Sequence, residues 1–196
     1  GSEMCIRDRN STVINVLPDK QENDKVTLYI DPAHFTEHAP PPSPINLIIA
    51  LPRPKTARRI IRTATELGVK QLHFINSYKV EKSYWQSPLL QQDKLQHQIL
   101  LGLEQSSDTA VPTIHLHKLF NPFVEDSLPS LVGKQATFLA DPDSQNSLTT
   151  PMIDNRMQDQ NYWIVIGPEG GFTDYEKDKL VASGCQPITP VSYTHL

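Results

Sequence analysis

Apolar runs along this chain alternate with segments in which apolar residues recur every three or four positions. Ile45–Leu51 is a continuous apolar run, which predicts a strand buried in a parallel sheet. Lys55–Leu67 has the apolar stripe of a helix that packs on a core, and Gly68 follows as a helix stop. Gln71–Ile75 predicts a return strand, so the three segments form a β-α-β unit. The stripe consists of Ala57, Ile60, Ile61, Ala64 and Leu67.

The alternation continues toward the end of the chain. Helical spacing predicts helices over Asp93–Gln105, around Phe123–Leu131 and over Thr173–Ser183. Runs of β-forming residues predict strands over Thr113–Leu116, Gln135–Ala140, Trp163–Ile166 and Gln186–Thr189. The polar segment Asp141–Gln160 is predicted to be a flexible loop. Because strands and helices alternate, the predicted fold class is α/β, with a doubly wound sheet.

The N-terminal part has a different pattern. Thr12–Leu17 and Lys25–Ile30 are rich in β-forming residues, and the turn-forming residues PDKQEND separate them, which predicts a β-hairpin. Four prolines then predict a stiff linker and a domain boundary. These are Pro40, Pro41, Pro42 and Pro44.

Both ends of the chain look foreign to a natural protein. Gly1–Ser2 resembles a cloning remnant, and Glu3–Arg9 and Val191–Leu196 resemble translated adapter sequence. We therefore exclude these residues from the fold prediction and expect the native gene to extend further at both ends.

The most informative segment is Tyr162–Glu176, with the sequence YWIVIGPEGGFTDYE. Trp163–Ile166 predicts a short strand buried on both faces. Three glycines follow, which permit a sharp turn and the close approach of a ligand to the backbone. Thr173 and Glu176 have the spacing of a capping box, which predicts the start of a helix. The segment therefore places backbone amides at the carboxyl end of a sheet, where α/β folds bind ligands. The glycines are Gly167, Gly170 and Gly171.

The residues of this turn restrict the ligand. A phosphate-binding loop ends in Lys and Ser or Thr, which are absent here, and Glu169 would repel an anion. A carboxylate suits ribose hydroxyls or a cation. S-adenosylmethionine, which combines an adenosine with a sulfonium, fits this turn better than ATP. The alternative is an ordinary connection between a strand and a helix.

Basic residues are concentrated in one part of an acidic chain. The net charge is -4, yet the span from Arg53 to Lys82 contains eight of the 18 basic residues and only two acidic ones. This asymmetry favours contacts with RNA phosphates, and a solvated helix face is the alternative. Tyr84 and Trp85 could stack on an unpaired base or belong to the core. The candidate RNA-binding residues are Arg53, Lys55, Arg58, Arg59, Arg62, Lys79, Lys82 and Gln105.

Other chemistries have little support in the sequence. His73, His97, His115 and His117 lack further ligands at a suitable spacing, so we predict no metal site. The chain has two cysteines, Cys5 and Cys185, and neither a secretion signal nor an apolar run that could span a membrane, so we expect a cytoplasmic protein. No G-x-S-x-G motif indicates a hydrolase.

Several motifs together resemble one family. They are ATELGV (Ala64–Val69), VEKSYWQ (Val80–Gln86), LEQS (Leu103–Ser106) and IGPEGGFTDYE (Ile166–Glu176). The segment from Asn46 to Pro190 is similar to the RsmE family, the 16S ribosomal RNA (uracil-N3)-methyltransferases of the SPOUT superfamily. This resemblance implies a Rossmann-like sheet with a C-terminal trefoil knot, S-adenosylmethionine as cofactor and a homodimer.

The resemblance also implies domains and site residues. Residues 10–39 would be the remnant of a small PUA-like β-barrel domain, and residues 45–196 the methyltransferase domain. Asp141 could bind ribose or start the turn before Pro142. Gln105 lies in the segment that matches the family's E-Q-S. Asp108 stands where the family usually has an arginine, which puts RNA binding at this point in doubt. Gln105 could instead merely cap its helix. The implied cofactor-binding residues are Leu139, Ala140, Asp141, Ile166, Gly167, Pro168, Glu169, Gly170 and Gly171.

We therefore expect a methyltransferase that acts on N3 of a uridine in small-subunit ribosomal RNA. A SPOUT enzyme for transfer RNA and a non-catalytic RNA-binding paralogue are the alternatives. The family's L-G turn and R-T-E-T segment would follow the last strand and close the cofactor pocket. Because this chain ends before them, we expect it to be inactive as it stands.

Overall fold

The computed structural model describes residues 4–7, 13–16, 18–22, 25–28, 43–106, 110–146 and 161–189, the first four of these ranges as backbone only. Several sequence predictions fall outside the described residues. They concern the linker prolines Pro40, Pro41 and Pro42, the replacement at Asp108, most of the polar loop and the tail after Thr189.

A six-stranded parallel sheet forms the centre of the structure, with the order β10-β8-β9-β5-β6-β7. The doubly wound α/β prediction is confirmed, and each predicted strand begins and ends within two residues of its predicted bounds. The strands are β5 (Ile45–Ala50), β6 (Gln71–Ile75), β7 (Thr113–His117), β8 (Thr137–Ala140), β9 (Tyr162–Ile166) and β10 (Gln186–Ile188).

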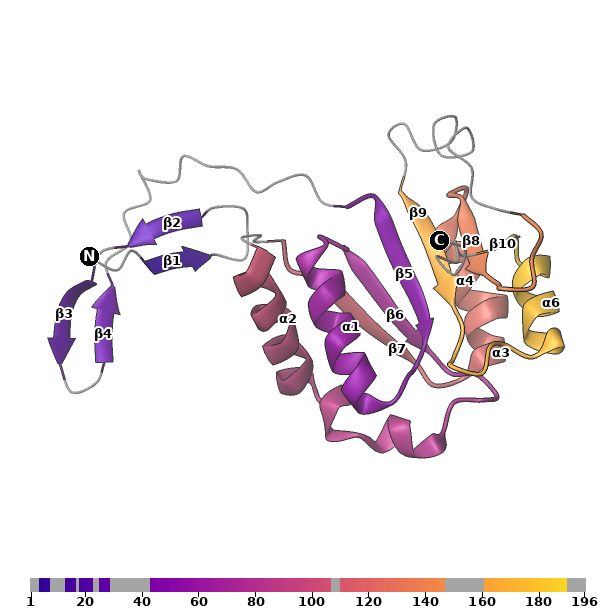
Figure 1. The fold of residues 1–196 in the computed structure, drawn as a ribbon, viewed down its shortest axis with the longest axis horizontal. Coiled ribbons are helices and arrows are strands. Elements are labelled where there is room, and N and C mark those ends of the chain that lie inside the picture. The colour runs from indigo at the N-terminus through magenta and orange to yellow at the C-terminus, as the bar shows by residue number, and fades with distance from the viewer. Residues whose placement is uncertain are drawn as a thin grey trace, which may run out of the picture.

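The connections place the helices on both faces of the sheet. The chain passes from β5 to β6 to β7 in one direction through α1 (Pro54–Glu66) and α2 (Gln92–Ser106). It then returns to β8, and later passes from β9 to β10 through α6 (Asp174–Ala182). Because parallel crossovers are right-handed, opposite directions put these helices on opposite faces. In Figure 1, α1 and α2 lie beside β5–β7, while α4 and α6 gather near β8–β10.

The shorter helical pieces connect strands near the carboxyl end of the sheet. Between β7 and β8 the chain forms α3 (Phe120–Pro122), a π-helical turn (Phe123–Ser127) and α4 (Leu128–Val132), which confirms the predicted helix in this region. Between β6 and α2 it forms two 3₁₀ turns, Lys82–Gln86 and Pro88–Leu90, which the sequence pattern did not predict.

Two details of the predicted burial are wrong. Leu67, placed on the apolar stripe of α1, follows the last helical residue and is 68% exposed. Strand β9 is not buried on both faces, because Trp163 and Val165 are buried whereas Ile166 is 37% exposed. The physical reason for this exposure is the position of β9 in the sheet. Helices α1 and α2 connect β5, β6 and β7, whereas β9 lies on the other side of β5 from β6 and β7.

The N-terminal strands pair differently from the predicted hairpin. Strand β2 (Val13–Val16) pairs with β1 (Met4–Arg7), and β3 (Pro18–Glu22) pairs with β4 (Lys25–Leu28), both antiparallel. The residues expected to form the turn are therefore largely a strand themselves. Strand β4 pairs with the segment immediately before it, which requires the shortest loop and costs the least chain entropy.

Three histidines that are distant in the sequence meet on neighbouring strands. His73 of β6 pairs in register with His115 of β7, and His73 Nδ1 lies 3.0 Å from His117 Nε2. The edge of the His73 ring packs against Trp163. Burial, and then the charges of the other two histidines, lower the pKa of His73 to about 3. The sequence spacing concealed this cluster because it forms only when β6 and β7 pair.

The described residues contain no group of three His, Cys, Asp or Glu side chains arranged to hold a metal ion. Among them, no helix is long and apolar enough to cross a membrane. Cys185 is buried with a free thiol, and burial raises its pKa to about 12.

The His73 environment predicts a dependence of stability on pH. Because the folded pKa lies below the unfolded value of 6.5, the unfolded state binds more protons between about pH 6.5 and 3. The free energy of unfolding should therefore fall as the pH is lowered through this range, by roughly 2 kcal/mol at pH 5 from this residue. In urea titrations from pH 7 to 5, His73→Phe should reduce this loss.

The exposed His97 on α2 offers a matched control, because His97→Phe should leave the pH dependence unchanged. If His73→Phe and the unsubstituted chain lost the same stability on acidification, the interpretation of His73 as a buried, neutral histidine would be wrong.

Candidate functional site at the carboxyl end of the sheet

The glycine turn after β9 depends on the small size of its residues. Gly171 has a φ of 70°, which favours glycine, and its N–H donates to the carbonyl of Pro168 at 2.8 Å. A Cβ on Gly167 would lie 3.1 Å from the Phe172 ring, and one on Gly170 would lie 3.1 Å from Cδ of Lys79. The turn is therefore packed closely on its own Phe172 and on Lys79 from the loop after β6.

The predicted capping box is present at the start of α6. Thr173 Oγ1 accepts a hydrogen bond from the Glu176 N–H, and Glu176 Oε2 accepts one from the Thr173 N–H at 2.9 Å. The same carboxylate accepts from the Tyr78 N–H at 2.7 Å and from the Ser77 hydroxyl at 3.3 Å. Glu176 is only 3% exposed. It therefore connects the loop after β6 to the loop after β9, a role that its place in the capping box did not reveal.

Lys79 makes a second connection between the same two loops. Its Nζ donates to the carbonyl of Gly170 at 2.6 Å, and its side chain lies where a Cβ on Gly170 would be. Lys79, predicted to bind RNA, thus places a positive charge directly on the glycine turn. Glu169, next to Gly170, remains exposed.

The end of β8 lies beside the glycine turn. Ala140 pairs in register with Ile166, so Leu139, Ala140 and Asp141 reach the same end of the sheet as the turn. The structure thus brings the predicted cofactor-binding residues together. Asp141 Oδ1 accepts from the Asp143 N–H at 3.2 Å and from Lys177 Nζ at 2.8 Å, so this residue does start a turn. The hydrogen bond to Asp141 raises the pKa of Lys177.

The predicted RNA-binding residues do not form a single patch. Arg53 and Lys55 lie at the carboxyl end of the sheet, where α1 begins. Arg62, two turns further along, donates from Nε to Gln98 of α2 at 2.8 Å and so belongs partly to the contact between the helices. Gln105 lies in the last turn of α2, which precedes β7 and is therefore at the opposite, amino end of the sheet. Arg58, Arg59 and Lys82 are exposed.

Tyr84 and Trp85 pack against the core. Both are half-buried, and the Trp85 Nε1 donates to Asn76 Oδ1 at 2.9 Å. Of the two interpretations of these aromatic residues, packing in the core is therefore the one that the structure shows.

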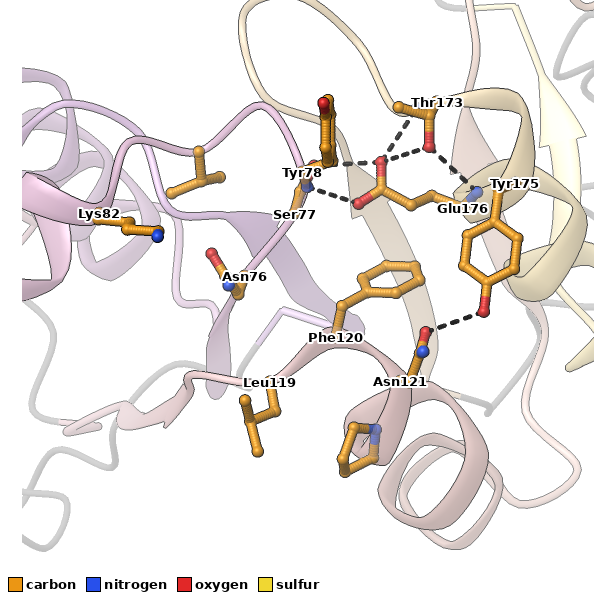
Figure 2. Close-up of a pocket in the computed structure, with 12 residues that line it drawn as sticks. Asn76, Ser77, Tyr78, Lys82, Leu119, Phe120, Asn121, Thr173, Tyr175 and Glu176 are labelled. Atoms are coloured by element: carbon orange, nitrogen blue, oxygen red, sulfur yellow. Dashed lines mark hydrogen bonds between the residues drawn. The ribbon is translucent and has the colours of Figure 1, made fainter.

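A groove of about 670 Å³ opens between three loops at the carboxyl end of the sheet. The loop after β6 contributes Tyr78, the loop after β7 contributes Phe120 and Asn121, and the start of α6 contributes Tyr175 and Glu176 (Figure 2). None of the predicted cofactor-binding residues lines this groove, and Lys82 is its one predicted RNA-binding residue. Sequence reasoning missed the others, although each follows the end of a predicted strand.

This arrangement defines a doubly wound α/β protein whose candidate site lies at the carboxyl end of the sheet, where the strand order reverses between β5 and β9. Residues 39–189 match the RNA methyltransferase domain family, and the chain belongs to this family. The family resemblance found in the sequence is therefore confirmed.

Two relatives carry the name ribosomal RNA small subunit methyltransferase E. The protein from Treponema pallidum is 29% identical over 145 residues, which are 74% of this chain and 54% of the relative. The protein from Synechocystis is 29% identical over 152 residues, which are 76% of this chain and 47% of the relative. The chain thus spans about half the length of these relatives.

Solved structures share the fold. Ribosomal RNA small subunit methyltransferase E from Neisseria gonorrhoeae, solved with S-adenosylmethionine, superposes with a TM-score of 0.74 at 18% identity, covering 97% of this chain and 75% of that one. A Legionella pneumophila protein, also solved with S-adenosylmethionine, gives 0.76 at 17% identity, with 99% and 76% covered.

The Glu176 contacts predict a large effect of its removal. Glu176→Ala would leave the partly buried N–H groups of Tyr78 and Thr173 without their acceptor, which costs up to about 1 to 3 kcal/mol each. We expect a loss of about 2 to 5 kcal/mol in the free energy of unfolding, measured by urea denaturation.

Asp178→Ala on the same helix removes an exposed carboxylate and should change stability by less than about 0.5 kcal/mol. Equal effects of the two substitutions would show that Glu176 does not hold the loops together.

Proposed function

We propose that this chain is the catalytic part of a methyltransferase that transfers the methyl group of S-adenosylmethionine to N3 of a uridine in small-subunit ribosomal RNA. The family match over residues 39–189 carries the proposal. The names of the relatives support small-subunit RNA as the substrate, and the two structural neighbours were solved with S-adenosylmethionine.

The residues beside the glycine turn fit this cofactor. Ile166 offers exposed apolar surface next to Ala140, which suits an adenine ring. Gly171 leaves the backbone of the turn open to a ligand, because no atom of the described residues beyond its chain neighbours lies within 4 Å of where its Cβ would be. The carboxylate of Asp141 lies at the neighbouring strand end, where it can accept from ribose hydroxyls. Glu169 is exposed on the turn, where its charge can stabilise a sulfonium. S-adenosylmethionine supplies an electrophilic methyl group when it is bound.

The chain's own residues would act mainly by positioning the uracil base and the cofactor. N3 of uracil carries a proton near neutral pH, so methylation requires a site that stabilises the deprotonated base. The Lys79 ammonium is fixed to the turn by its bond to the Gly170 carbonyl and can stabilise that anion. No side chain is assigned as a general base. Fixing the base in line with the methyl group would supply most of the rate increase.

The remaining family features are part of the proposal. We assign residues 10–39 to a PUA-like domain and residues 45–196 to the methyltransferase domain. A trefoil knot would involve the chain after β10, and two copies would form the active dimer. The incomplete cover over Ile166 is consistent with further chain or a second copy packing there.

The cofactor site can be tested at Glu169. In Glu169→Arg, two cationic groups would face each other, so the affinity for S-adenosylmethionine should fall at least tenfold in isothermal titration calorimetry. The circular dichroism spectrum should not change, because Glu169 is exposed.

Asp178→Arg makes the same change of charge on an exposed position of α6 and should retain the affinity. Full affinity in Glu169→Arg would exclude this role of the turn. Methylation of stripped small subunits, but not of bulk transfer RNA, is the expected substrate preference.

The exposed basic residues of α1 can be tested by salt dependence. Changing Lys55, Arg58 and Arg59 together to Glu should weaken RNA binding and flatten the plot of log K against log salt by about two units, because three phosphate contacts are lost. Arg62 is left unchanged because it bonds to Gln98. As a control, Lys70, Lys94 and Lys134, which are also exposed, are changed to Glu. The same slope in both triple variants would mean that this face of α1 is only solvated.

A further inference from the structure

Two tyrosines stand exposed at the groove, beyond what core packing requires. Tyr78, in the loop after β6, is 86% exposed, and Tyr175, in the first turn of α6, is 54% exposed, although both are large aromatic residues. The backbone of Tyr78 is held by its N–H bond to Glu176, so the ring extends into solvent from a fixed point beside the groove. Exposed aromatic rings on a fixed backbone are the usual means by which proteins stack unpaired bases.

The polar groups of the groove are mostly donors. Asn76 Oδ1 already accepts from Trp85 Nε1, and Asn121 Oδ1 accepts from the Tyr175 hydroxyl at 3.4 Å. The amide NH₂ groups of both asparagines can therefore donate to other acceptors, such as the carbonyl oxygens of a pyrimidine base. Figure 2 shows Asn76 and Asn121 on either side of the Phe120 ring.

The charges of the groove also favour RNA. Glu176 is the carboxylate among the lining residues, and it is only 3% exposed and already accepts from Tyr78, Ser77 and Thr173. Lys82 lines the groove with an exposed ammonium group. A base with an attached phosphate therefore meets donors and a positive charge there.

Two aromatic rings, those of Phe120 and Phe172, lie between the groove and the glycine turn. The Phe172 ring packs against Gly167 on one side, and its centroid lies 6.2 Å from that of Phe120, which lines the groove. A base in the groove would therefore be a neighbour of the reacting base and separated from the cofactor.

We propose that this groove binds a nucleotide that flanks the methylated uridine, with its base stacked on Tyr78 and Tyr175. This inference rests on the proposed function, because it takes the glycine turn as the cofactor site. The groove would fix the register of the RNA, so that only one uridine reaches the turn.

The test uses the full chain and a short single-stranded RNA that spans the methylated uridine of the small subunit. Tyr78→Ala combined with Tyr175→Ala should weaken RNA binding by roughly fivefold to a hundredfold. The affinity for S-adenosylmethionine should stay the same. Tyr78→Phe combined with Tyr175→Phe should restore binding, because the rings can still stack. Tyr162→Phe, on β9, is the control for loss of a tyrosine hydroxyl elsewhere.

Photocross-linking distinguishes the groove from the rest of the surface. With 5-iodouridine at positions flanking the target, cross-links to Tyr78 or Tyr175 would support the proposal, and cross-links confined to α1 would overturn it. Unchanged RNA affinity in the double alanine variant would overturn the groove and leave the proposed function standing. The proposed function is tested separately, by titration of S-adenosylmethionine into the chain extended after Pro190 with the L-G and R-T-E-T segment of a relative. If that extended chain failed to bind the cofactor, the proposed function would fail, and the RNA titrations would still decide whether the groove holds RNA.

Discussion

The buried carboxylate of Glu176 is the interaction on which the rest of the site depends. A carboxylate that is 3% exposed is tolerated only when hydrogen bonds replace its water. The N–H groups of Tyr78 and Thr173 and the hydroxyls of Ser77 and Thr173 supply those bonds. Because these donors come from two loops far apart in the sequence, satisfying one charge fixes the two loops relative to each other.

The geometry of both candidate sites, the glycine turn and the groove, depends on this connection. The glycine turn ends at Thr173, and the groove is lined by the loop that carries Tyr78. Lys79 ties the same loop to the Gly170 carbonyl, so two contacts hold the second half of the turn to the loop after β6. A site that is fixed before its ligands bind loses less conformational entropy on binding. The parallel direction of all six strands brings these loops together in the first place, since it places every strand's carboxyl end at the same edge of the sheet.

Local patterns predicted the elements, and long-range contacts escaped prediction. The β5–α1–β6 unit and the capping box could be predicted because each depends on residues within a few turns of one another. The bond from Glu176 to Tyr78, the stacking of His73 on His115 and the bond from Arg62 to Gln98 depend on which strands and helices become neighbours. The order of the sheet decides that, and no short motif encodes it. The prediction of the N-terminal hairpin was wrong for a related reason, because several β-forming segments compete for the same partners.

The distribution of basic residues limits how RNA can lie on the protein. Helix α1 has 13 residues, which corresponds to a length of about 20 Å at 1.5 Å per residue. Arg53 and Lys55 lie at one end of it, whereas Gln105 lies at the far end of the neighbouring α2. A single nucleotide cannot contact both ends. If Gln105 contacts RNA, it contacts a segment several nucleotides away from the base at the glycine turn. The exposed residues Lys55, Arg58 and Arg59 all lie in the first half of α1 and span about 6 Å along its axis, so this row would cover only part of the distance between the two ends.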